Sequence, residues 1–274
     1  MTMARRPIIG VFDSGFGGLT VLKALLEVIP EGDYLYFGDT ARLPYGSKSV
    51  ETVARYAVEA AHFLEARGAQ LLVIACNTAT ALALDRIVAA AHVPVVGVVE
   101  PGAEAAAAVS KNKKVVVVGT EATVSSHAYK KALEARGVEA REKACPLLVP
   151  LVEEGWVEHP VTDQVAGIYL AEAFADGFHD ADALVLGCTH YPLLKAVLRK
   201  AAPEHVSIVD SAESTARVVA ERLQGLLASA EGEERRTVPR IRFFATDSVE
   251  KFRRLGERFL GHPIEDVEHV DLKE

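Results

Sequence analysis

Short apolar runs rich in β-branched residues alternate with longer segments of helical periodicity along most of this 274-residue chain. The alternation is typical of βα units, in which parallel strands form a sheet and the connecting helices pack on it. Several apolar runs carry no polar residue on either face, as expected when helices cover both sides of the sheet. The pattern therefore predicts an α/β fold with mainly parallel sheets flanked by helices. The predicted strands are residues 8–12, 34–38, 71–75, 95–98, 114–119, 183–187, 207–210 and 240–245.

An internal repeat divides this α/β pattern into two halves. Residues 71–79 read LLVIACNTA and residues 183–191 read ALVLGCTHY, and the strands that end at Asp13 and Gly119 form a second pair at a similar offset of about 110 residues. Repeated units at one offset indicate two related α/β domains. We expect the joint at the turn-like sequence EPG, residues 100–102. The predicted domains are residues 1–99 plus 208–274 and residues 100–207, with the active site between them.

The overall charge and the cysteine pattern exclude several classes of function. The formal net charge of -8 argues against a protein whose main partner is nucleic acid, because such proteins usually carry a basic face. No apolar run is long enough for a membrane helix, and no targeting signal is evident, so we expect a cytoplasmic protein without a membrane partner. The three cysteines are widely spaced, which favours free thiols over disulfides or a zinc site. Residues 231–236 are predicted to form an exposed loop.

Four polar motifs follow predicted strands, at the strand ends where ligands bind in open α/β sheets. Two of them place a cysteine, Cys76 and Cys188, at equivalent points of the two halves. If the halves pack with approximate two-fold symmetry, the two thiols face each other across a bound substrate. The four motifs are DSGFGG at 13–18, CNT at 76–78, GT at 119–120 and CTH at 188–190.

Two opposed thiols suit the inversion of a stereocentre, which needs a base on one face of the carbon and an acid on the other. A thiol has an ordinary pKa near 8.5, so modest help from its surroundings allows it to abstract a proton at neutral pH. A nucleophilic role is the alternative, but a cysteine hydrolase pairs its cysteine with a histidine, and only Cys188 has one nearby, His190. A lone cysteine is most often inert packing, and we interpret Cys145 in this way.

Other residues near the strand ends have both a functional and a structural interpretation. Asp13 could hold an ammonium group or simply cap the following helix, and its loop matches neither a phosphate loop nor a dinucleotide fingerprint. One of Glu153 and Glu154 could face the site as a second acid. Residues 44–46, PYG, could offer backbone N–H groups to a carboxylate or form a simple turn. His190 could equally be a satisfied structural histidine, and the motif lacks the further ligands of a metal site.

Taken together, these motifs resemble the glutamate racemase family. The resemblance covers residues 8 to about 225, through DSGxGG, PYG, CNTA and CTHYP, while the tail after Gly225 carries no diagnostic residue. It implies two α/β domains, interconversion of L- and D-glutamate without cofactor or metal, supply of D-glutamate for peptidoglycan, and a homodimer.

The resemblance also implies roles for individual residues. Cys76 and Cys188 are the two acid/base residues, the first acting on D-glutamate and the second on L-glutamate, and Asp13, His190 and Glu153 support them. The implied substrate-binding residues are Asp13, Ser14, Pro44, Tyr45, Gly46, Asn77, Thr78, Thr120, Thr123, Thr189 and His190. Two alternatives stay open: a racemase of another acidic amino acid such as aspartate, and an amino-acid-binding protein without catalysis.

Overall fold

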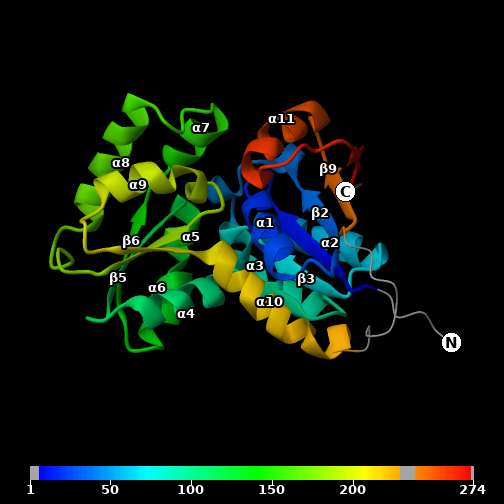
Figure 1. Cartoon of the computed structure of the whole chain (residues 1–274), viewed down its shortest axis with the longest axis horizontal. Coiled ribbons are helices and arrows are strands. Elements are labelled where there is room, and N and C mark those ends of the chain that lie inside the picture. Colours follow the sequence, from blue (N-terminus) through cyan, green and yellow to red (C-terminus); the bar gives the residue numbers. More distant parts are fainter. Residues whose placement is uncertain (1–5, 229–237, 273–274) are drawn as a thin grey trace.

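The computed structural model describes residues 6–228 and 238–272 and contains two parallel sheets, one in each half of the molecule (Figure 1). The expected loop at 231–236 lies outside the described residues. The first sheet has six strands in the order β10-β9-β2-β1-β3-β4. Their bounds are β1 Ile8–Asp13, β2 Asp33–Gly38, β3 Leu71–Ile74, β4 Val95–Gly97, β9 Ile241–Ala245 and β10 Val267–His269. The second has four in the order β6-β5-β7-β8, with bounds β5 Lys114–Gly119, β6 Glu139–Ala144, β7 Ala183–Gly187 and β8 Ser207–Asp210.

Helices flank both sheets, which confirms the predicted fold class. All strand pairs in the described part of the chain are parallel. The helices are α1 Leu19–Val28, α2 Val50–Ala66, α3 Asn77–Ala90, α4 Val99–Val109, α5 Glu121–Ser126, α6 Ala128–Glu134, α7 Leu148–Glu153, α8 Pro160–Ala173, α9 Lys195–Ala201, α10 Ser211–Ala228 and α11 Val249–Leu260. Three short 3-10 helices are η1 Thr40–Arg42, η2 Tyr45–Ser47 and η3 Tyr191–Leu194.

Two strands, β6 and β10, were not predicted from the sequence. Both lie at an edge of their sheet, so each has a single neighbouring strand. β6 reads EAREKA and has only one buried residue, Ala140, while the three residues of β10 are half-buried or exposed. Edge strands can carry charged residues because one side of the strand faces solvent. Such strands lack the apolar pattern by which the central strands were recognised.

Two helices carry the chain between the sheets. α4 follows β4 of the first sheet and leads to β5 of the second, and α10 follows β8 of the second and leads to β9 of the first. The sequence EPG at 100–102, predicted as a turn-like joint, lies in the first turns of α4 instead. Proline is tolerated there because the first helical N–H groups have no partner within the helix. The chain returns to the first sheet after Asp210, and the domain limits at 99 and 207 stay a prediction.

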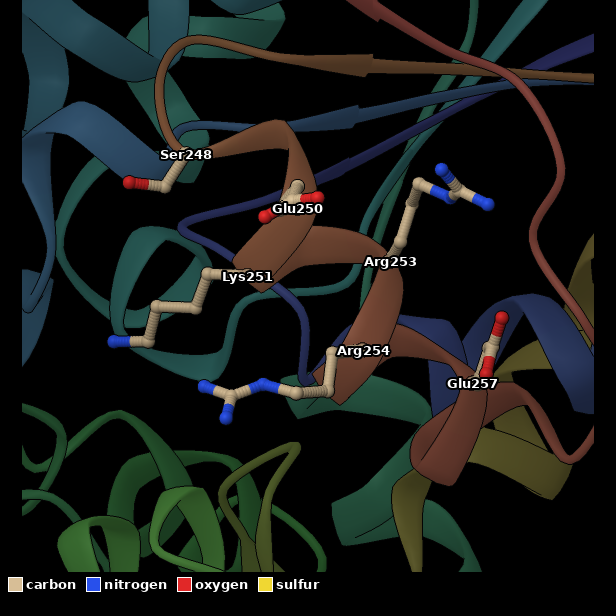
Figure 2. Close-up of a pocket in the computed structure, with 6 residues that line it drawn as sticks. All are labelled: Ser248, Glu250, Lys251, Arg253, Arg254 and Glu257. Atoms are coloured by element: carbon tan, nitrogen blue, oxygen red, sulfur yellow. The ribbon is translucent and has the colours of Figure 1, made fainter.

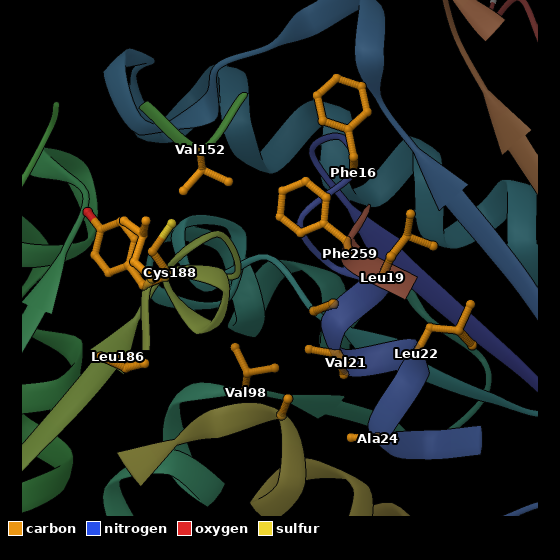
Figure 3. Close-up of a cluster of buried hydrophobic side chains, with 14 of the residues drawn as sticks. Phe16, Leu19, Val21, Leu22, Ala24, Val98, Val152, Leu186, Cys188 and Phe259 are labelled. Carbon is orange, nitrogen blue, oxygen red and sulfur yellow. The ribbon is translucent and has the colours of Figure 1, made fainter. Parts of the chain in front are cut away.

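One apolar core runs from one half into the other. It contains Leu19 of α1, Val98 before α4, Leu186 of β7 and Phe259 of α11, all at most 3% exposed. Figure 3 shows these side chains together with Cys188, which belongs to the same cluster. Apolar contacts therefore hold the two halves together. In the described part of the chain, no helix is long and apolar enough to span a membrane.

Candidate active site between the two halves

A cavity of about 470 Å³ lies between the carboxyl ends of the two sheets, and both Cys76 and Cys188 line it. Most of the predicted site residues line the same cavity. They are Ser14, Pro44, Tyr45, Gly46, Asn77, Thr78, Thr120, Glu153, Thr189 and His190. Asp13 and Thr123 are fully buried directly behind these residues. The structure thus brings together side chains from sequence positions as far apart as 13 and 190.

Cys76 caps the N-terminus of α3. Its sulfur accepts a hydrogen bond from the backbone N–H of Ala79 at 3.4 Å, and its thiol donates to the hydroxyl of Ser14 at 3.6 Å. Burial, with a smaller contribution from the carboxyl group of Asp13, raises the pKa of Cys76 to about 12. Cys76 is therefore a protonated thiol at neutral pH, which can act as an acid.

Cys188 lies beside an imidazole instead. Its sulfur is 4.0 Å from Nδ1 of His190, and Nε2 of His190 is 3.4 Å from Oε1 of Glu153, a charge contact without the direction of a hydrogen bond. Burial opposes the charged form of His190, but its interactions with Cys188 and Glu153 outweigh this effect and raise the pKa of His190 to about 10. The imidazole is thus positively charged at neutral pH and stabilises negative charge on the neighbouring sulfur.

Glu153 and Glu154 differ in their surroundings. Glu153 is half-buried, and its second carboxylate oxygen lies 3.7 Å from Nζ of Lys251 on α11. Burial would raise the pKa of Glu153, but His190 and Lys251 together lower it, so that the group is a carboxylate at neutral pH. Glu154 also lines the cavity but is exposed. Of the two glutamates, the structure places Glu153 beside His190.

Asp13 lies under the glycine-rich loop rather than at the cap of α1, where the structure has Gly18. Its carboxylate accepts hydrogen bonds from the backbone N–H of Gly15 at 2.8 Å and from the hydroxyl of Thr189 at 3.5 Å. Burial raises the pKa of Asp13, although His190 opposes the shift. The alternative of a simple helix cap is therefore wrong for Asp13.

The glycine-rich loop packs directly on the CTH motif of the other half. A Cβ atom at Gly17 would lie 2.3 Å from Oγ1 of Thr189 and 2.6 Å from Nδ1 of His190, so a side chain there would collide with both. Only glycine allows this approach. The close contact joins the end of β1 to the end of β7.

Polar side chains cluster at the starts of α3 and α5, next to Cys76. The hydroxyl of Thr78 lies 3.0 Å from that of Thr120 and 3.2 Å from that of Thr123, which links the start of α3 to the start of α5. Nδ2 of Asn77 is buried and has no hydrogen-bond partner among the described residues. The N-termini of helices favour anions. These groups form a donor surface that suits a carboxylate.

Residues 44–46 are more than the simple turn that the sequence left open. Tyr45 and Gly46 begin the 3-10 helix η2, and the Tyr45 hydroxyl donates a 2.5 Å hydrogen bond to the buried carboxylate of Asp39. Asp39 also accepts a hydrogen bond from Thr246 after β9 at 2.9 Å. A Cβ atom at Gly46 would lie 3.0 Å from Cβ of Thr120, so the loop closely approaches the second half.

Sequence reasoning missed several residues that line the cavity. Lys251 is the one with a charge partner in the site, Glu153, and it comes from the tail in which no diagnostic residue was recognised. It also lines a shallow hollow on α11, where Figure 2 shows Lys251 and Arg254 extending to the same side of the helix. No local signal marks Lys251, because its position depends on the packing of α11. The other unpredicted lining residues are Leu43, Ser47, Glu121, Pro146, Val149 and Pro150.

Cys145 does not line the cavity. It is fully buried in the core, and its thiol donates to the backbone carbonyl of Lys143 at 3.6 Å. Among residues 6–228 and 238–272 there is no cluster of three His, Cys, Asp or Glu side chains that could hold a metal ion.

Comparison with known proteins agrees with this geometry. A sequence model of the Asp/Glu/Hydantoin racemase family matches residues 17–219. The glutamate racemase of Koribacter versatilis is 60% identical over 286 aligned residues, which cover 98% of each chain. Most of the chain, including every cavity motif after Phe16, is thus covered by both comparisons.

Solved structures show the same arrangement of elements. The glutamate racemase of Bacillus anthracis is 39% identical with a TM-score of 0.90 and covers 98% of each chain. The glutamate racemase of Francisella tularensis, solved in complex with D-glutamate, is 35% identical with a TM-score of 0.88 and covers 97% of this chain and 98% of that one. The chain therefore belongs to the Asp/Glu/Hydantoin racemase family and, within it, groups with the glutamate racemases.

Proposed function

We propose that this protein interconverts L- and D-glutamate by acid/base catalysis with two thiols and without a cofactor. The observation that carries the proposal is that Cys76 and Cys188, one from each half, line a single cavity. A relative named glutamate racemase, 60% identical over almost the whole chain, supports glutamate as the substrate.

In the direction from L- to D-glutamate, the Cys188 thiolate removes the proton from Cα and becomes a thiol. The Cys76 thiol then delivers its own proton to the opposite face of Cα and becomes a thiolate. The reverse reaction uses the same groups in exchanged roles, as microscopic reversibility requires. The raised pKa of Cys76 supports its role as the acid in the first direction, because burial keeps the thiol protonated until the carbanion forms.

The side of the cavity that contains Cys188, which we call the second side, supports the formation of a base. His190 carries a positive charge next to the sulfur of Cys188, and the carboxylate of Glu153 holds that imidazole. On the first side, which contains Cys76, Asp13 takes the place that His190 has on the second. We propose that Asp13 interacts with the ammonium group of the substrate and assists Cys76. Its buried carboxyl group lies under the loop that carries Ser14.

The hardest step is the removal of a proton beside a carboxylate, because negative charge then grows on the carboxylate oxygens. Donors fixed before the reaction stabilise that charge most effectively. We propose that Asn77, Thr78, Thr120 and Thr189 supply these donors together with the backbone N–H groups of Ser14 and Gly46. The unpartnered Nδ2 of Asn77 supports this assignment.

A deuterium wash-in experiment tests the reaction and its substrate together. Purified protein is incubated in deuterated water with each enantiomer of glutamate and of aspartate. We expect L-glutamate to lose its circular dichroism while one deuterium enters at Cα, and aspartate to keep its signal. Racemisation of aspartate would favour the alternative substrate. Binding of glutamate without exchange of the α-hydrogen would instead indicate a binding protein and refute the proposal.

The cellular role that we propose is the supply of D-glutamate for peptidoglycan. We place the protein in the cytoplasm, because two free thiols are kept reduced there. We also propose a homodimer, as the family resemblance implies, which sedimentation equilibrium tests directly. A mass that stays at one chain over the micromolar range would contradict it.

A further inference from the structure

The side-chain amide of Asn77 has two ends in different surroundings. Its oxygen, Oδ1, accepts a 2.7 Å hydrogen bond from the hydroxyl of Tyr129 on α6. Its nitrogen, Nδ2, is buried without a partner among the described residues, and Asn77 lines the cavity. A buried N–H donor without a partner is costly unless a ligand satisfies it. The bond at Oδ1 therefore determines which end of the amide faces the substrate.

Tyr129 is well placed to hold this orientation. The side chain is fully buried, and burial raises the pKa of its phenol, so that the hydroxyl stays protonated and donates a hydrogen bond to Oδ1. The side chain of Ser211 lies beside the same phenol and opposes this rise in pKa. Because Tyr129 belongs to the second half and Asn77 to the first, this bond crosses between the halves.

The phenol also lies where the two connecting helices meet. Ser211 is the first residue of α10. A Cβ atom at Gly102 of α4 would lie 3.1 Å from the Tyr129 hydroxyl and 3.1 Å from Cβ of Ser211. The starts of both helices that join the halves thus contact Tyr129. Any change in the angle between the halves would move this phenol relative to Asn77.

We propose that Tyr129 is a positioning residue for substrate binding, which aims the amide N–H₂ of Asn77 into the cavity and links that orientation to the packing of the two halves. The ligand class is the α-amino acid carboxylate of the proposed function, on which this inference rests. Tyr129 does not line the cavity, so it acts through Asn77 and not by contact with substrate.

The substitution Tyr129→Phe removes only the hydroxyl group. We expect the KM for both enantiomers of glutamate to rise about tenfold, the worth of one hydrogen bond to a buried polar group, while kcat changes by less than about threefold, because the amide binds the substrate carboxylate before the reaction as well as during it. Tyr34→Phe is the matched control, because the Tyr34 hydroxyl donates to the carbonyls of Leu25 and Ile29 in the first half. This control removes a buried tyrosine hydroxyl outside the cavity and should leave KM unchanged.

A double-mutant cycle separates positioning from general destabilisation. If Tyr129 acts through Asn77, Tyr129→Phe should change KM by less than twofold in an Asn77→Ala background. A tenfold increase that persists without the Asn77 amide would overturn the proposal. An unchanged KM in the single variant Tyr129→Phe would overturn it as well.

Nuclear magnetic resonance provides a readout that does not depend on turnover. The chain contains only two asparagines, Asn77 and Asn112, so selective ¹⁵N-asparagine labelling yields two side-chain ¹⁵N resonances, each with a pair of N–H signals. We expect Tyr129→Phe to shift the Asn77 signal and leave Asn112 unchanged. An unshifted Asn77 signal would contradict the proposal even if the protein proved not to racemise glutamate, whereas loss of racemisation in the wild type alone would refute only the proposed function.

Discussion

The two sides of the cavity share a strand-and-cysteine design but differ in their charges. Cys76 caps a helix and is surrounded by the hydroxyl of Ser14 and the buried carboxyl of Asp13. Cys188 lies beside the positively charged His190, which Glu153 holds. A repeated fold unit thus carries two different electrostatic environments. The difference suits a reaction in which one thiol begins as the acid and the other as the base.

We expect the largest effect when one of the two cavity thiols is removed at a time. Cys76→Ala and Cys188→Ala should each lower racemisation at least about 1,000-fold, because each removes one of the two proposed proton carriers, and serine variants should retain only traces. In deuterated water, Cys76→Ala should still exchange the α-hydrogen of L-glutamate, and Cys188→Ala that of D-glutamate. Circular dichroism and mass spectrometry measure both effects.

Cys145→Ala is the control for this test, since Cys145 is a third buried thiol that does not line the cavity. Its turnover should remain near that of the wild type. Near-native turnover in either of the other two alanine variants would instead disprove catalysis by two thiols.

The supporting groups of the two sides can be compared in the same way. His190→Asn removes the positive charge beside Cys188, and Asp13→Asn removes the carboxyl group beside Cys76. We expect each to lower kcat about 100-fold, with His190→Asn affecting L-glutamate more and Asp13→Asn affecting D-glutamate more. The kcat values for the two enantiomers, measured separately, check this. Equal losses in both directions for both variants would show that the sides are not specialised.

Between pH 7 and 9, the free energy of unfolding should change mainly because His190, on the second side of the cavity, loses its proton. The pKa of His190 is raised to about 10, so its contribution to folding is present below its ordinary value near 6.5 and is lost as the pH rises toward 10. We expect the free energy of unfolding to fall by on the order of 2 kcal/mol from pH 7 to 9, and His190→Asn to remove this decrease. Urea unfolding at several pH values measures it.

Cys76→Ala provides the comparison, because the pKa of Cys76 is raised to about 12 from a value near 9. Its contribution has the same sign but is lost only above pH 9. The variant should therefore keep the wild-type pH dependence between pH 7 and 9. If the free energy of unfolding of Cys76→Ala did not change between pH 7 and 9, the pH dependence would arise from Cys76 and not from His190.

The smallest expected effect concerns Lys251, which reaches the second side from α11. Its ammonium is 3.7 Å from Glu153 and the side chain is almost half exposed, so solvent weakens the pair. Lys251→Met should lower kcat/KM about threefold, while Arg254→Met on the same helix should have no effect. Steady-state kinetics measures kcat/KM for both variants. A loss above about 30-fold would mean that Lys251 contacts the substrate itself.

Local sequence patterns predicted the central strands and the position of both thiols. The runs before Cys76 and Cys188 are apolar on both faces, and the structure buries every residue of β3 and β7. A polar motif directly after such a strand must lie at the carboxyl edge of the sheet. These motifs could be predicted from the sequence because each consists only of a strand and the residues that follow it.

Features that depend on contacts between distant parts of the sequence could not be predicted in this way. The edge strand β6 lacks an apolar pattern, and EPG at 100–102 lies in α4 although its composition is turn-like. Lys251 lines the cavity only because α11 packs against α1 of the first half and holds Lys251 beside Glu153 at the end of α7. None of these results follows from the periodicity of a short window.

The sequence by itself determined the α/β class, the two halves and the paired cysteines, because backbone preference and the alternation of apolar residues act over a few neighbouring positions. The tertiary structure decided which glutamate faces His190 and which end of the Asn77 amide faces the cavity. Those outcomes depend on contacts between residues 37 to 52 positions apart. Only the packing of the folded chain brings such partners within hydrogen-bond distance.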